Sequence, residues 1–241
     1  MPNWVRNIVK ISEKTMIEIK NKYFENNIFK FNKVIPMPKE LMITSGSVTR
    51  ESILYALALK KPDDMVKTIK NVVNKGYQIA ASDIAMLFDD NELKKLKIEA
   101  RNYIPNRMER ELGLDTLEKF GNQCLNNIDK YGVTDWYKWA YENWGTKWDI
   151  EDSFSCNGNI MIFDTVWATP IPVFEVLSKE FPEELIEVEY ADEDIYGGNV
   201  GILHFLNGEL VNDFEKDGDF ARKVWEYELE ENETEEFETE Y

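Results

Sequence analysis

The chain contains few of the side chains that build disulfide frameworks and metal centres. Among its 241 residues are two cysteines, Cys124 and Cys156, and one histidine, His204. Two thiols are too few for a disulfide framework or a zinc site of thiolates, and one imidazole is too few for a site of histidines. We therefore expect a reduced, cytoplasmic protein that holds neither a metal ion nor another cofactor.

Long apolar runs are absent as well. No stretch approaches the roughly 20 apolar residues that a membrane helix needs, and the residues after Met1 include no apolar segment of the signal-peptide kind. We expect neither a secretion signal nor a membrane span. Apolar residues still make up 43% of the chain and include thirteen phenylalanines, which is enough for a packed core.

Positive charge is scarce in the last quarter of the chain. Residues 183–241 contain 21 acidic side chains and three basic ones, whereas residues 1–182 contain 25 of each sign. Because phosphate contacts need clustered Lys and Arg, direct binding of nucleic acid is disfavoured. The acidic quarter is either a solvated face with a frayed end or a surface that binds a basic partner.

Hydrophobic periodicity predicts two kinds of segment in the first part of the chain. Residues 1–44 form the first, with a strand at 5–11, a helix capped by Ser12 and a strand-like stretch at 29–34. Residues 45–145 carry apolar side chains at spacings of three and four, which predicts a block of helices. Within that block, Pro62 suits a helix start, while Gly76 and Gly132 suit helix ends.

The second part of the chain is predicted to be strand-rich. Residues 146–214 contain a helix that opens at Pro170 and a strong hairpin turn at Asn207-Gly208, with strands at 160–167, 185–190 and 199–205. Residues 215–241 form an acidic C-terminal segment. With the helical block set aside, the order of elements is that of a split βαβ, ferredoxin-like sheet. The predicted fold class is therefore α+β, ferredoxin-like, with a large all-helical insertion and an extra C-terminal hairpin.

Three groups of residues, taken in their order along the chain, resemble segments of a known protein family. They are Met1-Pro2-Asn3-Trp4 with Asn7; Phe31 to Pro38; and a third group of Trp139, Asn143 to Asp149, Phe163 to Trp167, Phe181-Pro182 and Tyr190. In these segments the chain resembles the YubB-like family of ferredoxin-like-domain proteins, which occur on plasmids and phages. The resemblance implies the fold and an origin on a mobile element of a bacterial host cell, and it supplies no catalytic residue.

The chain departs from that family in two places. The family tends to have Thr-Ala-Trp followed by Ser-Pro-Pro, whereas this chain has Thr165-Val166-Trp167 followed by Ala168-Thr169-Pro170. The acidic ending after Phe214 is particular to this chain.

Tryptophans gather where the helical block ends. Trp136, Ala140 and Trp144 are spaced for one helix face, and Gly145 suits the left-handed position that ends a helix. Trp148 and Asp149 are then expected to begin the next strand. The indoles are either buried core, or a partly open aromatic wall that stacks a base or nucleotide, with Asn143, Thr146 and Lys147 as polar contacts.

Other sequence features give weak evidence for chemistry. Asp213 to Gly218 resembles the start of an EF-hand loop, but Val224 stands where the loop needs a bidentate Glu. Asp192-Glu193-Asp194 is better explained as a solvated turn than as a cation site. His204 and Cys124 fit structural positions, and Cys156 fits a turn. Because no nucleophile stands beside an evident base, the sequence favours a protein that is not an enzyme.

Three functions follow as hypotheses. The first is a non-enzymatic phage or plasmid accessory protein that antagonises host defence by sequestering a small anionic ligand such as a nucleotide. The predicted pocket lies between the sheet and the helical insertion, and its candidate contacts are Trp4, Arg6, Asn143, Thr146, Lys147, Trp148 and Trp167.

The second hypothesis is an acidic antagonist or nucleic-acid mimic that blocks a basic surface of a host protein through Glu226, Glu228, Glu230, Glu231 and Glu233. The third is a hydrolase that acts through Asp149, Glu151 and Asp152. The oligomeric state cannot be read from the sequence.

Overall fold

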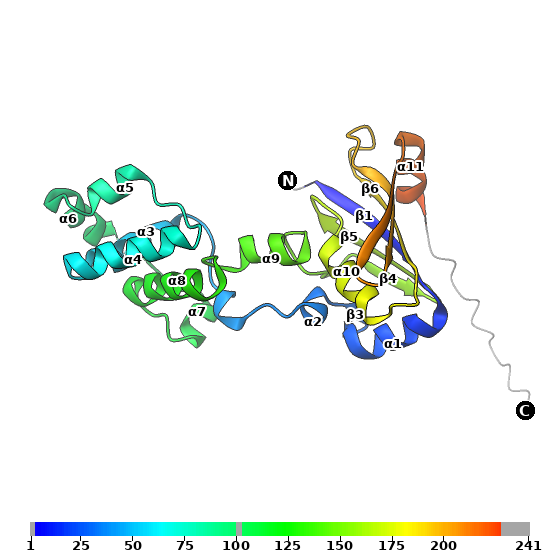
Figure 1. The fold of residues 1–241 in the computed structure, drawn as a ribbon, viewed down its shortest axis with the longest axis horizontal. Helices are drawn as coiled ribbons and strands as arrows, with labels where there is room; N and C mark the ends of the chain where they lie inside the picture. Colours follow the sequence, from blue (N-terminus) through cyan, green and yellow to red (C-terminus); the bar gives the residue numbers. More distant parts are fainter. Residues whose placement is uncertain (1–2, 100–102, 228–241) are drawn as a thin grey trace, which may run out of the picture. The chain divides into compact units, whose positions relative to one another are not determined.

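The computed structural model describes residues 3–99 and 103–227 (Figure 1). The chain divides into two compact units, each described here by itself. The ferredoxin-like unit consists of Met1–Pro36 and Asn143–Tyr241, and the helical unit consists of Met37–Glu142. Among the described residues, no helix is both long and apolar enough to cross a membrane.

The ferredoxin-like unit is built on a six-stranded antiparallel sheet with the order β4-β5-β1-β6-β7-β8. The strands are β1 (Trp4–Lys10), β4 (Phe154–Asn157), β5 (Ile160–Val166), β6 (Ile186–Asp192), β7 (Val200–Leu206) and β8 (Glu209–Glu215). With helices α1 (Glu13–Tyr23) and α10 (Ile171–Glu180), the first four strands of that order form the split βαβ arrangement. The hairpin of β7 and β8 extends it, so the predicted fold class is confirmed.

Both faces of the sheet carry helices. On one face, Phe163 of β5 stacks on Phe174 of α10 with ring centroids 6.4 Å apart, in a core that also contains Val5 and Val9. Because successive strand residues point to opposite faces, Ile8 lies on the other side. There it packs with Ala191 and Val200 against α11 (Gly218–Glu226), which contributes Ala221 and Val224. Figure 1 shows this last helix in orange-red beside the sheet.

The helical unit has a core of its own, centred on the packing of α3 (Ser47–Ala58) against α8 (Leu117–Tyr131). The other elements are the 3-10 helix η1 (Lys39–Leu41), α4 (Pro62–Asn74), α5 (Ala81–Met86), α6 (Asp90–Glu99) and α7 (Arg107–Glu111). The predicted boundaries at Pro62 and Gly132 are confirmed: Pro62 is the first residue of α4, and Gly132 follows α8 with a φ of 77°. Helix α9 (Trp136–Trp144) runs across the boundary between the units.

Two predictions about strands are wrong. Of the stretch at 29–34, only Phe29 lies in a strand, the two-residue β3 (Ile28–Phe29), which pairs with β2 (Phe24–Glu25). Phe31–Val34 is the short helix α2. Trp148 and Asp149 lie in a loop of residues 145–153, and the next strand begins at Phe154. One contact explains both errors: the Asp149 carboxylate binds the backbone N–H groups that open α2.

Helix α11 was not predicted, because it lies in the part of residues 215–241 that was expected to be only an acidic segment. Helix α7 lies inside the predicted helical block of residues 45–145. The glutamates from 228 onward that were proposed as an antagonist surface lie outside the described residues.

Candidate functional site

A cleft of about 320 Å³ opens in the ferredoxin-like unit where β1 begins and β5 ends. The loop of residues 145–153 supplies most of its wall. Its lining consists of Trp4, Trp148, Asp149, Glu151, Asp152, Ser153, Asp164, Thr165 and Val166. Trp4 is 38% exposed and Trp148 40% exposed, so the cleft presents two indoles that the core leaves partly accessible.

Side-chain hydrogen bonds hold the loop along β5. Strand β4 pairs only with residues 160–163 of β5. Beyond them, the loop lies beside Asp164 and Val166 of β5. The buried Thr146 hydroxyl accepts from the backbone N–H of Val166 at 3.1 Å and donates to its carbonyl at 2.9 Å. The Ser153 hydroxyl donates to Asp164 Oδ2 at 2.5 Å. Thr146 was predicted as a ligand contact, but its hydroxyl instead anchors the cleft wall.

The Asp149 carboxylate fixes the loop from the other side. It accepts from the backbone N–H groups of Phe31 at 2.7 Å, Asn32 at 3.2 Å and Ile150 at 2.8 Å. The bonds from Phe31 and Asn32 satisfy amide groups that the first turn of α2 leaves unpaired, and the bond from Ile150 lies within the loop. Burial raises the pKa of Asp149, although the three hydrogen bonds oppose that shift. Asp149 therefore serves as a structural cap.

Arg6 is also committed within the molecule. Its Nε donates to Asp164 Oδ1 at 3.0 Å, and its Nη1 donates to the carbonyl of Trp225 at 3.0 Å. The guanidinium carbon stacks 4.5 Å from the centroid of the Trp225 ring. Arg6 was predicted as a ligand contact, yet it does not line the cleft and instead ties α11 to the sheet. Trp225 was not among the residues predicted from the sequence.

Lys147 and Trp167 lie beside the cleft. The Lys147 ammonium nitrogen is 4.2 Å from the ring centroid of Trp148 and 5.2 Å from that of Trp167. Trp167 is 39% exposed and has a φ of 70°, which is unusual for a bulky residue. Four of the predicted contacts therefore gather here, since Trp4 and Trp148 line the cleft and Lys147 links Trp148 to Trp167. Asn143, in the last turn of α9, does not line it.

Two tryptophans of α9, Trp139 and Trp144, belong to the core. Trp144 is buried, its Nε1 donates to the carbonyl of Ile35 at 2.9 Å, and its ring contacts Phe31. Trp139 is buried as well. Trp139 and Trp144 of α9 therefore pack inside, Trp136 is half-buried, and the indoles after Gly145 stay partly open.

His204 and Cys124, the other candidates for chemistry, occupy structural positions. His204 Nε2 lies 3.1 Å from Glu187 Oε2, and the Lys10 ammonium lies 3.2 Å from Glu187 and 2.5 Å from Glu189. Cys124 is buried in the helical unit, and burial raises the pKa of its thiol. In the part of the chain that the structure describes, His, Cys, Asp and Glu form no group that could hold a metal ion.

Comparisons with known proteins give one family and one structure. Residues 143–239 match the family model described as the ferredoxin-like domain in Api92-like protein. The crystal structure of a protein api92 from Yersinia pseudotuberculosis aligns with 90% of this chain and 98% of that one, at 10% identity and a TM-score of 0.41. None of the curated proteins matches. The part of the chain that forms β4 to β8 is therefore similar to the ferredoxin-like domain of Api92-like proteins.

Proposed function

We propose that the protein is a non-enzymatic binding protein that sequesters a small organic ligand in the cleft lined by Trp4 and Trp148. One observation carries this proposal: two indoles, each about two-fifths exposed, stand in the walls of a single cleft. Large aromatic side chains bury most of their surface when they serve only as core. Stacking on such a ring stabilises a bound base by about 1–3 kcal/mol, so the cleft suits a flat or alkylated organic group.

The side chains around the cleft support binding rather than catalysis. The Ser153 hydroxyl donates to Asp164, whose charge is paired with Arg6. A serine nucleophile needs an adjacent general base that can take its proton, and the Asp164 carboxylate beside Ser153 already binds the Arg6 guanidinium. The histidine of this chain is hydrogen-bonded to Glu187 and does not line the cleft.

The biological setting is part of the same proposal. Its support is the resemblance of the sequence segments to YubB-like proteins of plasmids and phages, which suggests an accessory protein that antagonises host defence in the bacterial cytoplasm. An anionic nucleotide, predicted from the sequence, remains one candidate ligand because the stacking argument does not depend on charge.

Release of a bound molecule tests the proposal. The full chain would be purified from cells with active nucleotide-signalling defences and heat-denatured, and the filtrate analysed by mass spectrometry. We expect a small molecule in near-stoichiometric amount from the wild type and at most a tenth as much from the double variant Trp4→Ala/Trp148→Ala. The control Tyr141→Ala removes an exposed aromatic side chain that does not line the cleft and should release as much as the wild type. An empty wild-type filtrate, or equal release from the double variant, would overturn the proposal.

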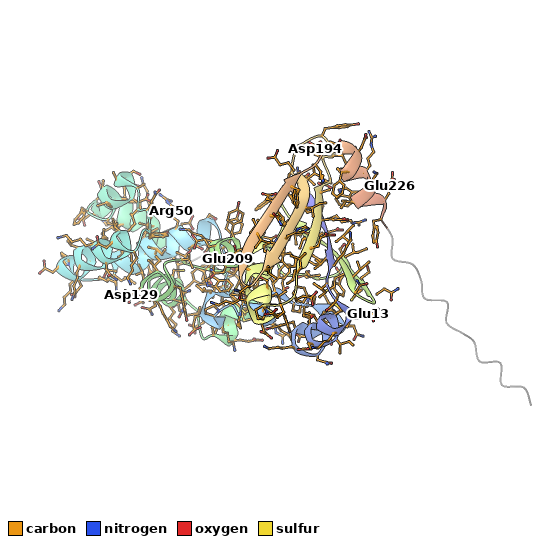
Figure 2. The ribbon with its side chains drawn as sticks, turned by 45° about the vertical axis from the view of Figure 1, so that its right-hand side comes forward. Glu13, Arg50, Asp129, Asp194, Glu209 and Glu226 are labelled. Carbon is orange, nitrogen blue, oxygen red and sulfur yellow. The ribbon has the colours of Figure 1, made fainter. Side chains whose placement is uncertain are left out.

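A second function has its own observation. Exposed acids continue from β8 to α11 through Glu209, Asp213, Glu215 and Glu226. Figure 2 labels Glu209 on β8, Glu226 on α11 and Asp194 in the loop between β6 and β7. We propose as the alternative that this surface occupies a basic patch on a host protein. Substitution of Glu209, Glu215 and Glu226 by Gln and of Asp213 by Asn should then abolish co-purification of that protein, whereas Trp4→Ala/Trp148→Ala should not.

A further inference from the structure

We infer that the ligand of the Trp4 and Trp148 cleft is an organic cation, with an alkylammonium or guanidinium group. This inference rests on the proposed function and names its ligand class. It departs from the anionic nucleotide expected from the sequence, and its basis is the charge of the cleft together with its aromatic walls.

The lining of the cleft carries charge of one sign. Four of the nine lining residues are acidic, namely Asp149, Glu151, Asp152 and Asp164, and none is Lys, Arg or His. Lys147 and Arg6 lie near, but both are turned to aromatic rings, at Trp148 and Trp167 and at Trp225 respectively. An anion in this cleft would face like charges, which disfavours binding, while a cation would be attracted.

Two of the four carboxylates are available to a ligand. Asp149 is bound by three backbone N–H groups, and Asp164 is bound by Arg6 and Ser153. Glu151 and Asp152 are exposed, and in the described part of the chain their side chains make no hydrogen bond or ion pair. The uncommitted negative charge of the cleft therefore comes from these two adjacent residues.

The aromatic walls decide what kind of cation fits. Acidic side chains here form no group that could hold a metal ion within the described residues, so the charge suits a larger, softer ion. Indole faces attract ammonium and guanidinium groups through their π electrons. The molecule contains one such contact already, since the Lys147 ammonium lies 4.2 Å from the Trp148 ring centroid. A cleft of about 320 Å³ is at the small end of ligand pockets.

Titration of the full chain with matched probes tests the inference. The probes are choline, its uncharged isostere 3,3-dimethyl-1-butanol, the guanidinium compound agmatine and the anion AMP, each followed by calorimetry. We expect choline or agmatine to bind at least ten times more tightly than the uncharged isostere, with no binding of AMP. Raising the salt concentration should weaken binding of the cation.

Substitutions separate the effect of the acidic side chains in the cleft from the effect of the net charge of the protein. Glu151→Gln/Asp152→Asn should weaken cation binding at least tenfold. The matched control Glu209→Gln/Asp213→Asn removes the same charge from exposed positions on β8 and should leave affinity unchanged. Lys147→Met should leave cation affinity equal or higher, whereas an anion would lose affinity.

The outcomes distinguish this inference from the proposed function. AMP binding, equal binding of choline and its isostere, or a neutral or anionic molecule in the heat-released filtrate would overturn the cation inference and leave the proposed function standing. Failure of every probe together with an empty filtrate would overturn both.

Discussion

Trp167 combines an exposed indole with an unfavourable backbone conformation. Its φ of 70° lies in the left-handed region, which costs a residue with a Cβ roughly 1–2 kcal/mol. Two hydrogen bonds hold it there: its N–H donates to the Asn3 carbonyl at 3.0 Å, and its carbonyl accepts from Asn199 Nδ2 at 3.5 Å. Strained residues that persist in this way gather at functional sites. Trp167 lies beside the cleft, because the Lys147 ammonium contacts both its ring and that of Trp148.

Paired substitutions at Trp167 should reveal the strain. Trp167→Gly and Trp167→Ala both remove the indole, but only Ala keeps a Cβ in the left-handed conformation. We expect the Gly variant to be more stable than the Ala variant by about 1 kcal/mol, measured by urea unfolding. At Trp4, which lies in β1, the same pair should show the opposite order. Equal stability of the two Trp167 variants would mean that the conformation costs little.

Glu109 shows how a single buried carboxylate organises the helical unit. The residue is 1% exposed, and its carboxylate accepts from the N–H groups of Thr44 and Asn106 and from the Tyr103 hydroxyl, each at 2.8 Å. With the Asn106 side chain it forms the capping box of α7. Burial alone would raise the pKa of Glu109, but these donors outweigh it and leave the pKa below its ordinary value.

The sign of that shift predicts a pH dependence. The pKa of Glu109 is lower in the folded state than in the unfolded chain, so the unfolded chain binds the proton more tightly. The free energy of unfolding therefore decreases as the pH is lowered below the ordinary value of 4.5. Glu109→Gln should lower the free energy of unfolding at pH 7 by about 1–3 kcal/mol and make it less sensitive to acid. Denaturant unfolding at pH 7 and pH 4, followed by circular dichroism, checks this. A variant that loses as much stability on acidification as the wild type would contradict it.

At the scale of elements, the sequence predicts what local patterns determine. Strands β1 and β5 form within a residue of the predicted ranges. Ser12 caps α1 and Gly132 follows α8, as predicted. Helices α7 and α11 also have local signals. Asn106 and Glu109 have the capping-box spacing. In α11 the Asp217 cap precedes an apolar face that contains Ala221 and Val224, within a segment whose acidic composition favoured a solvated end.

Other elements depend on contacts that no local pattern contains. Helix α2 is capped by a carboxylate 118 residues away in the chain. The loop that forms the cleft follows β5 because Thr146 binds Val166, a pairing across 20 residues. Trp4 and Trp148 were predicted from the sequence as ligand contacts because Trp148 follows Lys147 in a tryptophan-rich segment and Trp4 stands in a segment that resembles the YubB-like family. The acidic lining that surrounds them appears only once β1, β5 and the loop are brought together.

Gly121 controls the closest packing within the helical unit. It lies inside α8, and a Cβ added to it would come within 1.9 Å of the Ser52 carbonyl oxygen of α3. Gly→Ala in a helix interior is ordinarily stabilising by roughly 0.5–1 kcal/mol. Here we expect Gly121→Ala to destabilise by at least about 2 kcal/mol, because backbone atoms cannot give way cheaply.

Thermal unfolding of the helical unit measures this effect. Asn126→Ala is the matched control, since it lies on the exposed side of the same helix and should change stability by less than about 0.5 kcal/mol. If Gly121→Ala were as stable as the wild type, α3 and α8 would have to pack further apart than described.

At the scale of the whole molecule, two separate cores suggest two separable folding units. The buried cluster of the helical unit contains only residues from Ile43 to Ile128. In the ferredoxin-like unit, the cluster under α11 joins Ile8 to residues between Ile162 and Val224, so its two chain segments depend on each other. The hydrogen bond from Trp144 Nε1 to the Ile35 carbonyl brings the ends of those segments together at 2.9 Å.

This arrangement predicts that the helical unit can be removed. Replacing residues 37–142 by a short Gly/Ser linker should leave the sheet folded, because the cut ends already meet beside Ile35 and loop closure costs little when chain ends are close. We expect cooperative denaturant unfolding, retained strand content by circular dichroism and ligand release equal to that of the full chain. A variant that folds but releases no ligand would mean that the helical unit contributes to the site, and a variant that does not fold would mean that the sheet needs the insertion.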